Sequence, residues 1–212
     1  MVRKFALFDI DKTLVRGDSL FALYFYGARR WPVYWLWLPV IPFAGLLYAL
    51  KLLPVERVKR IFYAPLRRFH DADFAEFFDR KILARSLAQP MERLRCAREE
   101  GYYILLVTAS AACYMRPFVE RGFADALLGT EVERDGRGYT GRILGPNCRG
   151  EEKVRRIRAF LEQNGLQIDY ETSVGYSDSD SDIPMLRLVK TRYRVLHGGT
   201  VVPFVWQDHA DG

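Results

Sequence analysis

The fold of this chain is decided by the stretch Phe5-Ala-Leu-Phe-Asp-Ile-Asp-Lys-Thr-Leu14. Its first four residues form a short apolar run, which is typical of a buried strand. The run ends at two carboxylates, Asp9 and Asp11, which are two positions apart. An aspartate at a strand end is either a turn residue or part of a ligand site. The rest of the sequence decides between these two interpretations.

Further short apolar runs follow along the chain, and helix-like segments lie between several of them. The runs cover residues 103–107, 126–128, 173–176 and 193–196, and the helix-like segments cover residues 89–100, 151–164 and 183–189. Strands that alternate with helices indicate a parallel sheet with helices on both faces. The sequence therefore predicts an α/β fold with a Rossmann-like core.

Two segments interrupt this alternation. Residues 131–144 carry Asp135-Gly136 between flanks rich in β-formers, which predicts a β-hairpin. The larger interruption covers residues 16–88, because the sheet pattern resumes only after it. We therefore expect a catalytic core built from residues 1–15 and 89–212, with a helical cap of residues 16–88 inserted after the first strand.

The composition is that of a folded protein. Among 212 residues, 50% are hydrophobic and 27% are charged, which excludes a disordered chain. The net charge of +6 favours anionic partners such as phosphates, anionic lipid or nucleic acid, without choosing among them. The three cysteines form no closely spaced pair, so neither a zinc site nor a disulfide framework is expected. No secretory signal is visible, and a cytoplasmic location is expected.

Four groups of polar residues lie near the carboxyl ends of the predicted strands, which is where an open α/β sheet binds its ligands. Asp9 and Asp11 follow the first strand, Thr108 follows the second, Lys153 lies in the helix of residues 151–164, and a Ser/Asp-rich segment at 177–182 follows the fourth strand. Each alone has an ordinary explanation, as a turn residue, a helix cap, a solvated lysine or a polar loop. Their occurrence together favours one site.

The chemistry of these groups suits phosphoryl transfer, which needs a nucleophile, charge neutralisation and a hard cation. Asp9 can attack phosphorus, and Asp11 can protonate the leaving oxygen and later activate water. Thr108 and Lys153 can bind phosphoryl oxygens. Asp178 and Asp182, together with Asp9, would give an all-oxygen cage for Mg²⁺.

The order of these motifs resembles that of the haloacid dehalogenase superfamily of phosphatases, in the subgroup that includes phosphoserine phosphatase. The resemblance covers residues 1–15 and 89–200. It implies Asp9 as nucleophile, Asp11 as acid/base and Thr108 and Lys153 as phosphate ligands. It implies a Mg²⁺ site formed by a set of five residues, namely Asp9, Ile10 through its carbonyl, Asp11, Asp178 and Asp182. The fourth motif starts with Ser177 where the family often has glycine, and Asp180 is an additional carboxylate whose part in metal binding stays open.

Within the cap, residues 31–50 contain no charged side chain and are long enough for a membrane span. One crossing would put Asp9 and the later motifs on opposite sides of the membrane, and two would need about 40 apolar residues. Pro39 and Pro42 also interrupt a straight helix. We therefore expect a monotopic insert, a bent helix or helical hairpin that dips into one leaflet at the cytoplasmic face of the inner membrane. Burial in a soluble cap or a dimer interface is the alternative.

A basic cluster follows this apolar stretch, formed by Arg57, Lys59, Arg60, Arg67 and Arg68. Contact with anionic lipid headgroups and an ordinary solvated helix face explain it equally well.

The insert and three later segments resemble the phosphatidylglycerophosphatase C family. The segments begin at Cys148, Gly175 and Tyr193. The resemblance implies a phospholipid substrate, phosphatidylglycerophosphate, which would be converted to phosphatidylglycerol at a membrane surface. A soluble phosphatase of small metabolites such as phosphoserine is the alternative. A third interpretation, a protein that binds anions without catalysis, is supported by the basic charge alone. No nucleic acid partner is expected.

Overall fold

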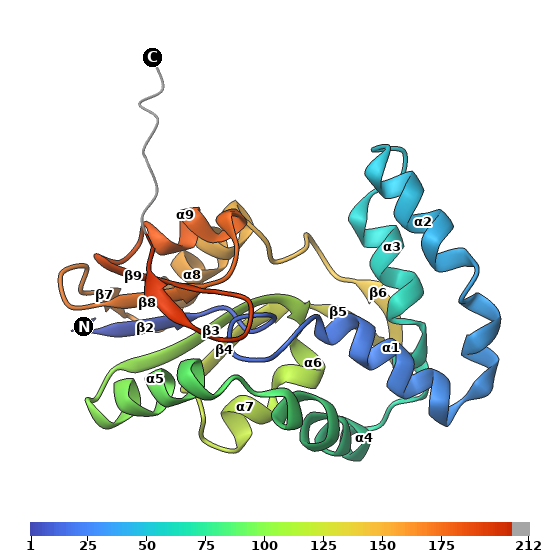
Figure 1. Cartoon of the computed structure of the whole chain (residues 1–212), viewed down its shortest axis with the longest axis horizontal. Helices are drawn as coiled ribbons and strands as arrows, with labels where there is room; N and C mark the ends of the chain where they lie inside the picture. Colours follow the sequence, from blue (N-terminus) through green and yellow to red (C-terminus); the bar gives the residue numbers. More distant parts are fainter. Residues whose placement is uncertain (205–212) are drawn as a thin grey trace.

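A computed structural model describes residues 1–204 of the chain. Its centre is a six-stranded sheet in the order β10-β9-β8-β2-β3-β4 (Figure 1). The strands are β2 (Phe5–Phe8), β3 (Tyr103–Ala111), β4 (Ala126–Thr130), β8 (Val174–Ser177), β9 (Thr191–Val195) and β10 (Val201–Pro203). All neighbouring pairs are parallel except β9 and β10. The predicted α/β fold with a parallel central sheet is confirmed.

Strand β2 lies in the middle of this sheet and is buried on both faces. Ala6 and Phe8 belong to one hydrophobic cluster, and Phe5 and Leu7 belong to another on the opposite face, as the two-residue period of a strand requires. Phe8 also stacks on Tyr176 of β8 at 4.3 Å between ring centroids. These contacts fix the position of the strand that carries Asp9.

Helices cover both faces of the sheet (Figure 1). On one side lie α8 (Glu151–Gln163) and α9 (Ile183–Leu186), and on the other lie α5 (Ala88–Glu99), α6 (Ala112–Met115) and α7 (Pro117–Glu120). The ends of α5 and α8 lie within one residue of the predicted ones, α9 ends three residues before its predicted end, and the sequence pattern did not predict α6 and α7. The short parallel pair β1 (Val2–Arg3) and β7 (Gln167–Ile168) was not anticipated, because two residues carry no periodic pattern.

The insert between β2 and β3 is helical, as predicted. Its elements are α1 (Ser19–Arg30), a 3₁₀ segment η1 (Pro32–Trp37), α2 (Val40–Ala49), α3 (Val55–Phe62), η2 (Ala64–Arg68), α4 (Asp71–Phe77), a π-helical turn η3 (Phe78–Ile82) and η4 (Leu83–Arg85). The chain enters and leaves it side by side, since Arg16 N–H donates to the Arg85 carbonyl at 2.7 Å and Leu87 N–H donates to the Leu14 carbonyl at 2.8 Å. The division at residues 16 and 88 into cap and core stays a prediction, and residues 205–212 of the expected core lie outside the described residues.

The charge-free stretch is broken near its prolines. The 3₁₀ segment η1 ends at Trp37, and α2 begins after Pro39, so the expected bend is present. Helix α3 then returns alongside α2, and together residues 31–62 form an arm that projects from the molecule (Figure 1). Among residues 1–204, no helix is both long and apolar enough to cross a membrane.

The predicted β-hairpin is confirmed as β5 (Val132–Asp135) and β6 (Gly138–Ile143), paired antiparallel. It packs against the insert rather than against the central sheet. A Cβ on Gly141 would lie 3.0 Å from the Tyr63 carbonyl, and Gly141 has a φ of +76°, so only glycine fits this approach. The hairpin and the insert therefore meet backbone to backbone. Cys96, Cys113 and Cys148 are not paired in disulfides.

The packing of α1 against η2 leads to a prediction about two helical glycines. A Cβ on Gly27 would lie 2.4 Å from Pro65 Cβ, whereas a Cβ on Gly45 in α2 would meet nothing within 4 Å. Gly27→Ala should lower the free energy of unfolding by about 1–3 kcal/mol, because overpacking outweighs the gain in helix propensity. The matched Gly45→Ala should raise it by up to about 1 kcal/mol. Denaturant unfolding measures both, and a Gly27→Ala protein as stable as Gly45→Ala would contradict the close contact.

Candidate active site

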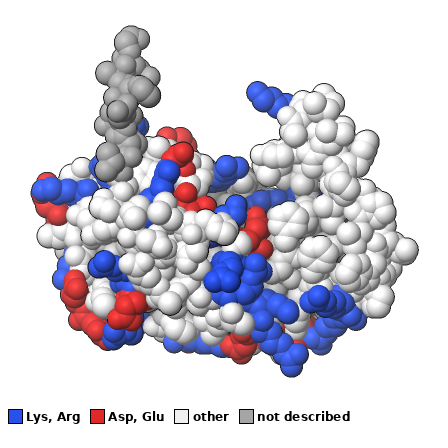
Figure 2. Space-filling view, viewed as in Figure 1, with Lys and Arg blue, Asp and Glu red and all other residues white. Residues whose placement is uncertain are grey.

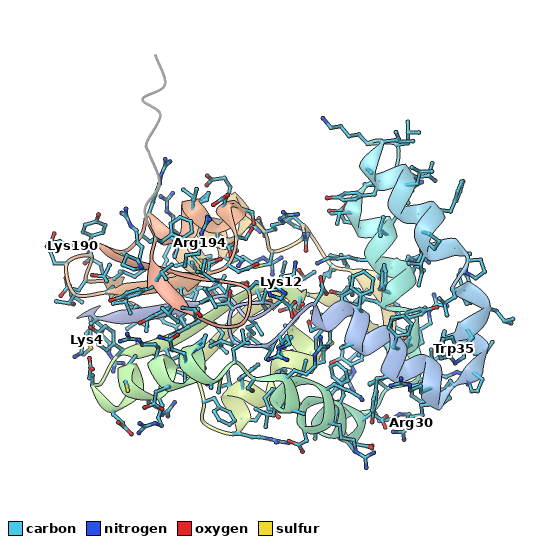
Figure 3. The ribbon with its side chains drawn as sticks, in the orientation of Figure 1. Lys4, Lys12, Arg30, Trp35, Lys190 and Arg194 are labelled. Carbon is cyan, nitrogen blue, oxygen red and sulfur yellow. The ribbon has the colours of Figure 1, made fainter. Side chains whose placement is uncertain are left out.

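The predicted site residues meet in one cavity of about 240 Å³ at the carboxyl ends of the central strands. Its lining contains all six side chains that the sequence singled out for chemistry, namely Asp9, Asp11, Thr108, Lys153, Asp178 and Asp182. Figure 2 shows a hollow between the arm and the rest of the molecule in which charged groups gather, and Figure 3 shows Lys12, another lining residue, between the sheet and the arm. The sequence motifs, which lie up to 173 residues apart (9 to 182), are therefore one site in space.

Lys153 is the central cation of this cavity. Its Nζ donates to Asp9 Oδ1 at 2.7 Å and to Asp182 Oδ2 at 2.8 Å, and only 2% of its side chain is exposed. Burial alone would lower the pKa of this lysine, but the two carboxylates raise it well above its usual value. Lys153 is therefore a permanent positive charge held against the expected nucleophile.

Asp9 is buried together with this lysine. Burial raises the pKa of Asp9 to about 7, against the attraction of Lys153, and the charge of Asp182 adds to the rise. Lys153 donates a hydrogen bond to one carboxylate oxygen of Asp9, and the Thr13 hydroxyl donates to the other at 3.3 Å. The carboxylate is thus held in position by a charged partner and a weaker neutral one.

Asp11 has a different set of partners. Its carboxylate accepts hydrogen bonds from the Ser19 backbone N–H at 2.9 Å, the Ser19 hydroxyl at 3.0 Å and the Ser110 hydroxyl at 2.5 Å. Burial raises the pKa of Asp11 to about 6, as does the charge of Asp18, although these hydrogen bonds oppose the rise. A carboxyl group with a pKa near neutrality can both give and take a proton, which suits an acid/base.

Thr108 lies where a phosphate ligand is expected. Its side chain is buried, and its oxygen accepts a hydrogen bond from the Ser110 backbone N–H at 3.1 Å. The hydroxyl proton remains available to a phosphoryl oxygen in the cavity. The two predicted phosphate ligands, Thr108 and Lys153, thus line the same space as Asp9.

The expected metal ligands are only partly brought together. The Thr13 hydroxyl lies 3.3 Å from Asp9 Oδ2 and 3.5 Å from Asp178 Oδ1, so both carboxylates lie beside the same side chain. Mg²⁺ is commonly bound by one or two carboxylates, with water and substrate oxygens completing its coordination. Asp9 and Asp178 fit such a site.

The prediction that three carboxylates form a cage for Mg²⁺ is wrong. Asp182 Oδ2 instead accepts hydrogen bonds from Lys153 Nζ at 2.8 Å and from the Ser177 hydroxyl at 2.7 Å. Within residues 1–204, no three acidic, histidine or cysteine side chains are grouped so that they could hold a metal ion. Asp182 instead positions Lys153.

Two further expectations about the metal ligands also need correction. The Ile10 carbonyl already accepts backbone hydrogen bonds from Thr13, Leu14 and Val15, so it is not a free ligand. The carboxylate of Asp11 already accepts hydrogen bonds from Ser19 and Ser110. The open question about Asp180 is answered by its exposed ion pair with Arg194, which holds it outside the cavity lining.

Lys59 also lines this cavity, although the sequence did not single it out for the site. It comes from α3 of the insert, and its Nζ donates to the Ala109 carbonyl at 2.5 Å and to Asn147 Oδ1 at 2.7 Å. Burial lowers its pKa to about 8. The basic cluster predicted from sequence is therefore divided, because Lys59 lines the catalytic cavity while Arg60 and Arg67 line another. Only its spacing among five basic residues was visible in the sequence, and spacing does not tell which one turns inward.

Comparison with known proteins places this site in a family. The model of haloacid dehalogenase-like hydrolases matches residues 6–187. A histidinol-phosphatase of Neisseria meningitidis is 27% identical over 205 residues, which cover 89% of this chain and 88% of that protein. The phosphoserine phosphatase SerB1 of Mycobacterium tuberculosis is 29% identical over 199 residues, which cover 88% of this chain and 62% of that protein. A crystal structure of a Bordetella pertussis protein of unknown function superposes with a TM-score of 0.78, at 26% identity, over 91% of this chain and 89% of that one.

The buried lysine leads to a prediction about stability and pH. Lys153→Met should cost about 3–5 kcal/mol of unfolding free energy near neutral pH, because Asp9 and Asp182 lose their cation. An acid whose pKa is raised on folding contributes stability below its unfolded pKa, near 4, that is lost as pH rises through the folded value. Without Lys153 the folded pKa of Asp9 rises further above 7, so the deficit should be larger at pH 8 than at pH 5.

Thermal unfolding at the two pH values measures this effect. Lys190→Met is the matched control, because it breaks an exposed pair with Glu171 and should leave the unfolding temperature nearly unchanged at both. If the loss of stability in Lys153→Met is the same at pH 5 and pH 8, Lys153 does not control the pKa of Asp9.

Proposed function

The chain belongs to the haloacid dehalogenase-like hydrolase family, and we propose that it is a Mg²⁺-dependent phosphomonoester hydrolase that uses Asp9 as nucleophile. One observation carries this proposal. Asp9 is held by the buried Lys153 in the same cavity in which the hydroxyls of Ser19 and Ser110 hold Asp11. A fixed nucleophile and a separately held acid/base are the groups that a two-step phosphoryl transfer needs.

In the first step, a carboxylate oxygen of Asp9 attacks phosphorus while the bond to the leaving oxygen breaks. Asp11 in its protonated form gives its proton to that oxygen. In the second step, Asp11 takes a proton from water, the water oxygen attacks phosphorus, and the bond to Asp9 breaks to release inorganic phosphate. Lys153 and the Thr108 hydroxyl stabilise the negative charge on the phosphoryl oxygens throughout.

A bound Mg²⁺ would supply further charge neutralisation at the phosphoryl group. Asp9 and Asp178 are the residues that would hold it, as their shared position beside Thr13 suggests. The excess of carboxylates supports a cation here, since the cavity lining contains five aspartates against four basic residues.

For the substrate we favour a small soluble phosphomonoester. The cavity is about 240 Å³, near the lower limit of small-molecule sites, and polar side chains dominate its lining. From the insert, only Leu20 and Val55 contribute apolar side chains to it. The names of the relatives, histidinol-phosphatase and phosphoserine phosphatase, agree with a substrate of this size.

A phospholipid substrate is the second candidate, and the arm favours it. Large apolar side chains of the arm are exposed, with Leu36 at 78%, Phe43 at 60% and Leu50 at 58%. In Figure 2 the arm is white over nearly all of its visible face, and Figure 3 shows Trp35 at its outer edge. An apolar face of this kind, with Arg29, Arg30 and Lys51 beside the charge-free stretch, suits one leaflet of a membrane surface. The expected location at the cytoplasmic face of the inner membrane belongs to this candidate.

The mechanism predicts different defects for the two aspartates. Asp9→Asn should abolish phosphate release from every substrate. Asp11→Asn should slow release from alkyl phosphates by about 10²–10⁴-fold, because no group protonates the leaving oxygen. The first turnover of p-nitrophenyl phosphate should be much less affected, since nitrophenolate leaves without a proton. Rapid-quench measurement of nitrophenolate and phosphate separates the two steps, and equal loss on both substrates would remove Asp11 from the role of acid.

Substrate class is tested with purified enzyme, Mg²⁺ and Asp9→Asn as the blank. We expect phosphate release from phosphoserine or histidinol phosphate, and none above the blank from phosphatidylglycerophosphate in detergent micelles. Release from the lipid alone would keep the chemistry and select the second candidate. Release from none of the three, with p-nitrophenyl phosphate also inert, would overturn the proposed function.

The second candidate makes its own prediction about the arm. If the arm enters a leaflet, a protein carrying Leu36→Asp and Phe43→Asp should lose most of its co-sedimentation with phospholipid vesicles. The matched control carries Val2→Asp and Leu196→Asp, which replace exposed apolar side chains of the core with the same charge. Equal binding by the two proteins would exclude the arm as the membrane contact, and no binding by the unmodified chain would exclude binding to a membrane surface.

A further inference from the structure

A second cavity lies outside the catalytic site, at the junction of the insert and the β5–β6 hairpin. Its volume is about 560 Å³, within the range of sites that bind small molecules. Five arginines line it, which are Arg60 of α3, Arg67 of η2, and Arg134, Arg137 and Arg142 of the hairpin. The guanidinium groups thus come from both sides of the junction.

The positive charge of this cavity is only partly offset within the protein. Its lining contains two carboxylates, and both accept hydrogen bonds from other groups. Glu133 Oε2 accepts from the Thr140 hydroxyl at 2.6 Å, and Asp135 Oδ1 accepts from the Arg137 backbone N–H at 2.8 Å. Five arginines against two carboxylates leave an excess of three positive charges in one concave surface.

Two of the guanidinium groups are held in place by uncharged partners. Arg134 lies over the ring of Tyr139, with 5.4 Å from its Cζ to the ring centroid, and Arg67 Nε donates to the Thr140 carbonyl at 3.0 Å. These contacts leave the terminal nitrogens of both arginines available. Planar guanidinium groups bind phosphate oxygens in pairs, so arginines that are already oriented lose less entropy on binding.

We propose that this cavity binds a phosphate group carried by a second molecule, at a site separate from the catalytic cavity and independent of the proposed function. The group is either part of a soluble phosphorylated molecule or the headgroup of an anionic phospholipid, since both present the same oxygens. A bound phosphate group contacts the insert through Arg60 and Arg67 and the hairpin through Arg134, Arg137 and Arg142. It therefore bridges the two.

This position connects the second cavity to the first. Helix α3 contributes Arg60 to the arginine cavity and the neighbouring Lys59 to the catalytic cavity. The hairpin and the insert are already in close contact at Gly141 and Tyr63. A ligand that joins them stabilises the folded state by binding it in preference to the unfolded chain.

The test compares three proteins in the presence of a chelator, so that no turnover is needed and its outcome does not depend on the phosphatase mechanism. The first is the unmodified chain, and the second carries Arg134→Gln and Arg137→Gln. The third, a control with the same net charge, carries Arg98→Gln and Arg158→Gln, which are exposed on α5 and α8. Unfolding temperatures in chloride alone report whether each variant is folded.

Each protein is titrated with inorganic phosphate at constant ionic strength while its unfolding temperature is followed. The unmodified chain and the control should show a saturable rise, and the Arg134/Arg137 variant should bind at least about tenfold more weakly, because charge-assisted hydrogen bonds are lost. A second arm measures co-sedimentation with vesicles of phosphatidylcholine alone or mixed with phosphatidylglycerol.

The two arms distinguish the source of the phosphate group. A defect of the Arg134/Arg137 variant in the first arm supports a soluble ligand, and a defect only with vesicles that contain phosphatidylglycerol supports a lipid headgroup. The proposal is overturned if the Arg134/Arg137 variant and the control variant bind equally well in both arms. It is also overturned if the unmodified chain shows saturable binding in neither arm.

Discussion

The structure depends on one buried cation between two carboxylates. Lys153 from α8 joins Asp9 at the end of β2 to Asp182 beyond β8, so three distant segments share one interaction. Removing two carboxylates and an ammonium group from water is unfavourable unless their geometry compensates for it. The fully apolar strand β2, clamped between both hydrophobic clusters, supplies that geometry. The hydrophobic core and the polar site thus depend on each other.

Four of the five aspartates that line the cavity differ in their sets of partners. Asp9 is held by Lys153, Asp11 by two serines, Asp182 by Lys153 and Ser177, and Asp178 lies beside Thr13. In the proposed mechanism, identical side chains therefore act as nucleophile, acid/base, positioning group and cation ligand, according to their surroundings. Because these partners come from non-adjacent segments, they assemble only when the sheet does.

The insert adds to this core without interrupting it, since its two ends are hydrogen-bonded to each other beside the active site. One face of α3 brings Lys59 to the catalytic cavity, and another brings Arg60 to the arginine cavity. The arm beyond them keeps its large apolar side chains exposed. The insert therefore contributes to the catalytic cavity, to the arginine cavity and to the exposed apolar surface of the arm.

The sequence by itself determined the elements that depend on local pattern. The buried run at residues 5–8, the Asp-Gly hairpin, the main helices and the bend at Pro39 follow from periodicity and turn chemistry, and the order of Asp9, Asp11, Thr108, Lys153 and Asp178 indicated one site at the strand ends. Only the tertiary structure decided that Asp182 binds Lys153, that the Ile10 carbonyl is already occupied and that Lys59 turns inward. The physical reason is that these outcomes depend on partners more than 25 residues away or on the exact path of a turn, and neither leaves a periodic signal in the chain.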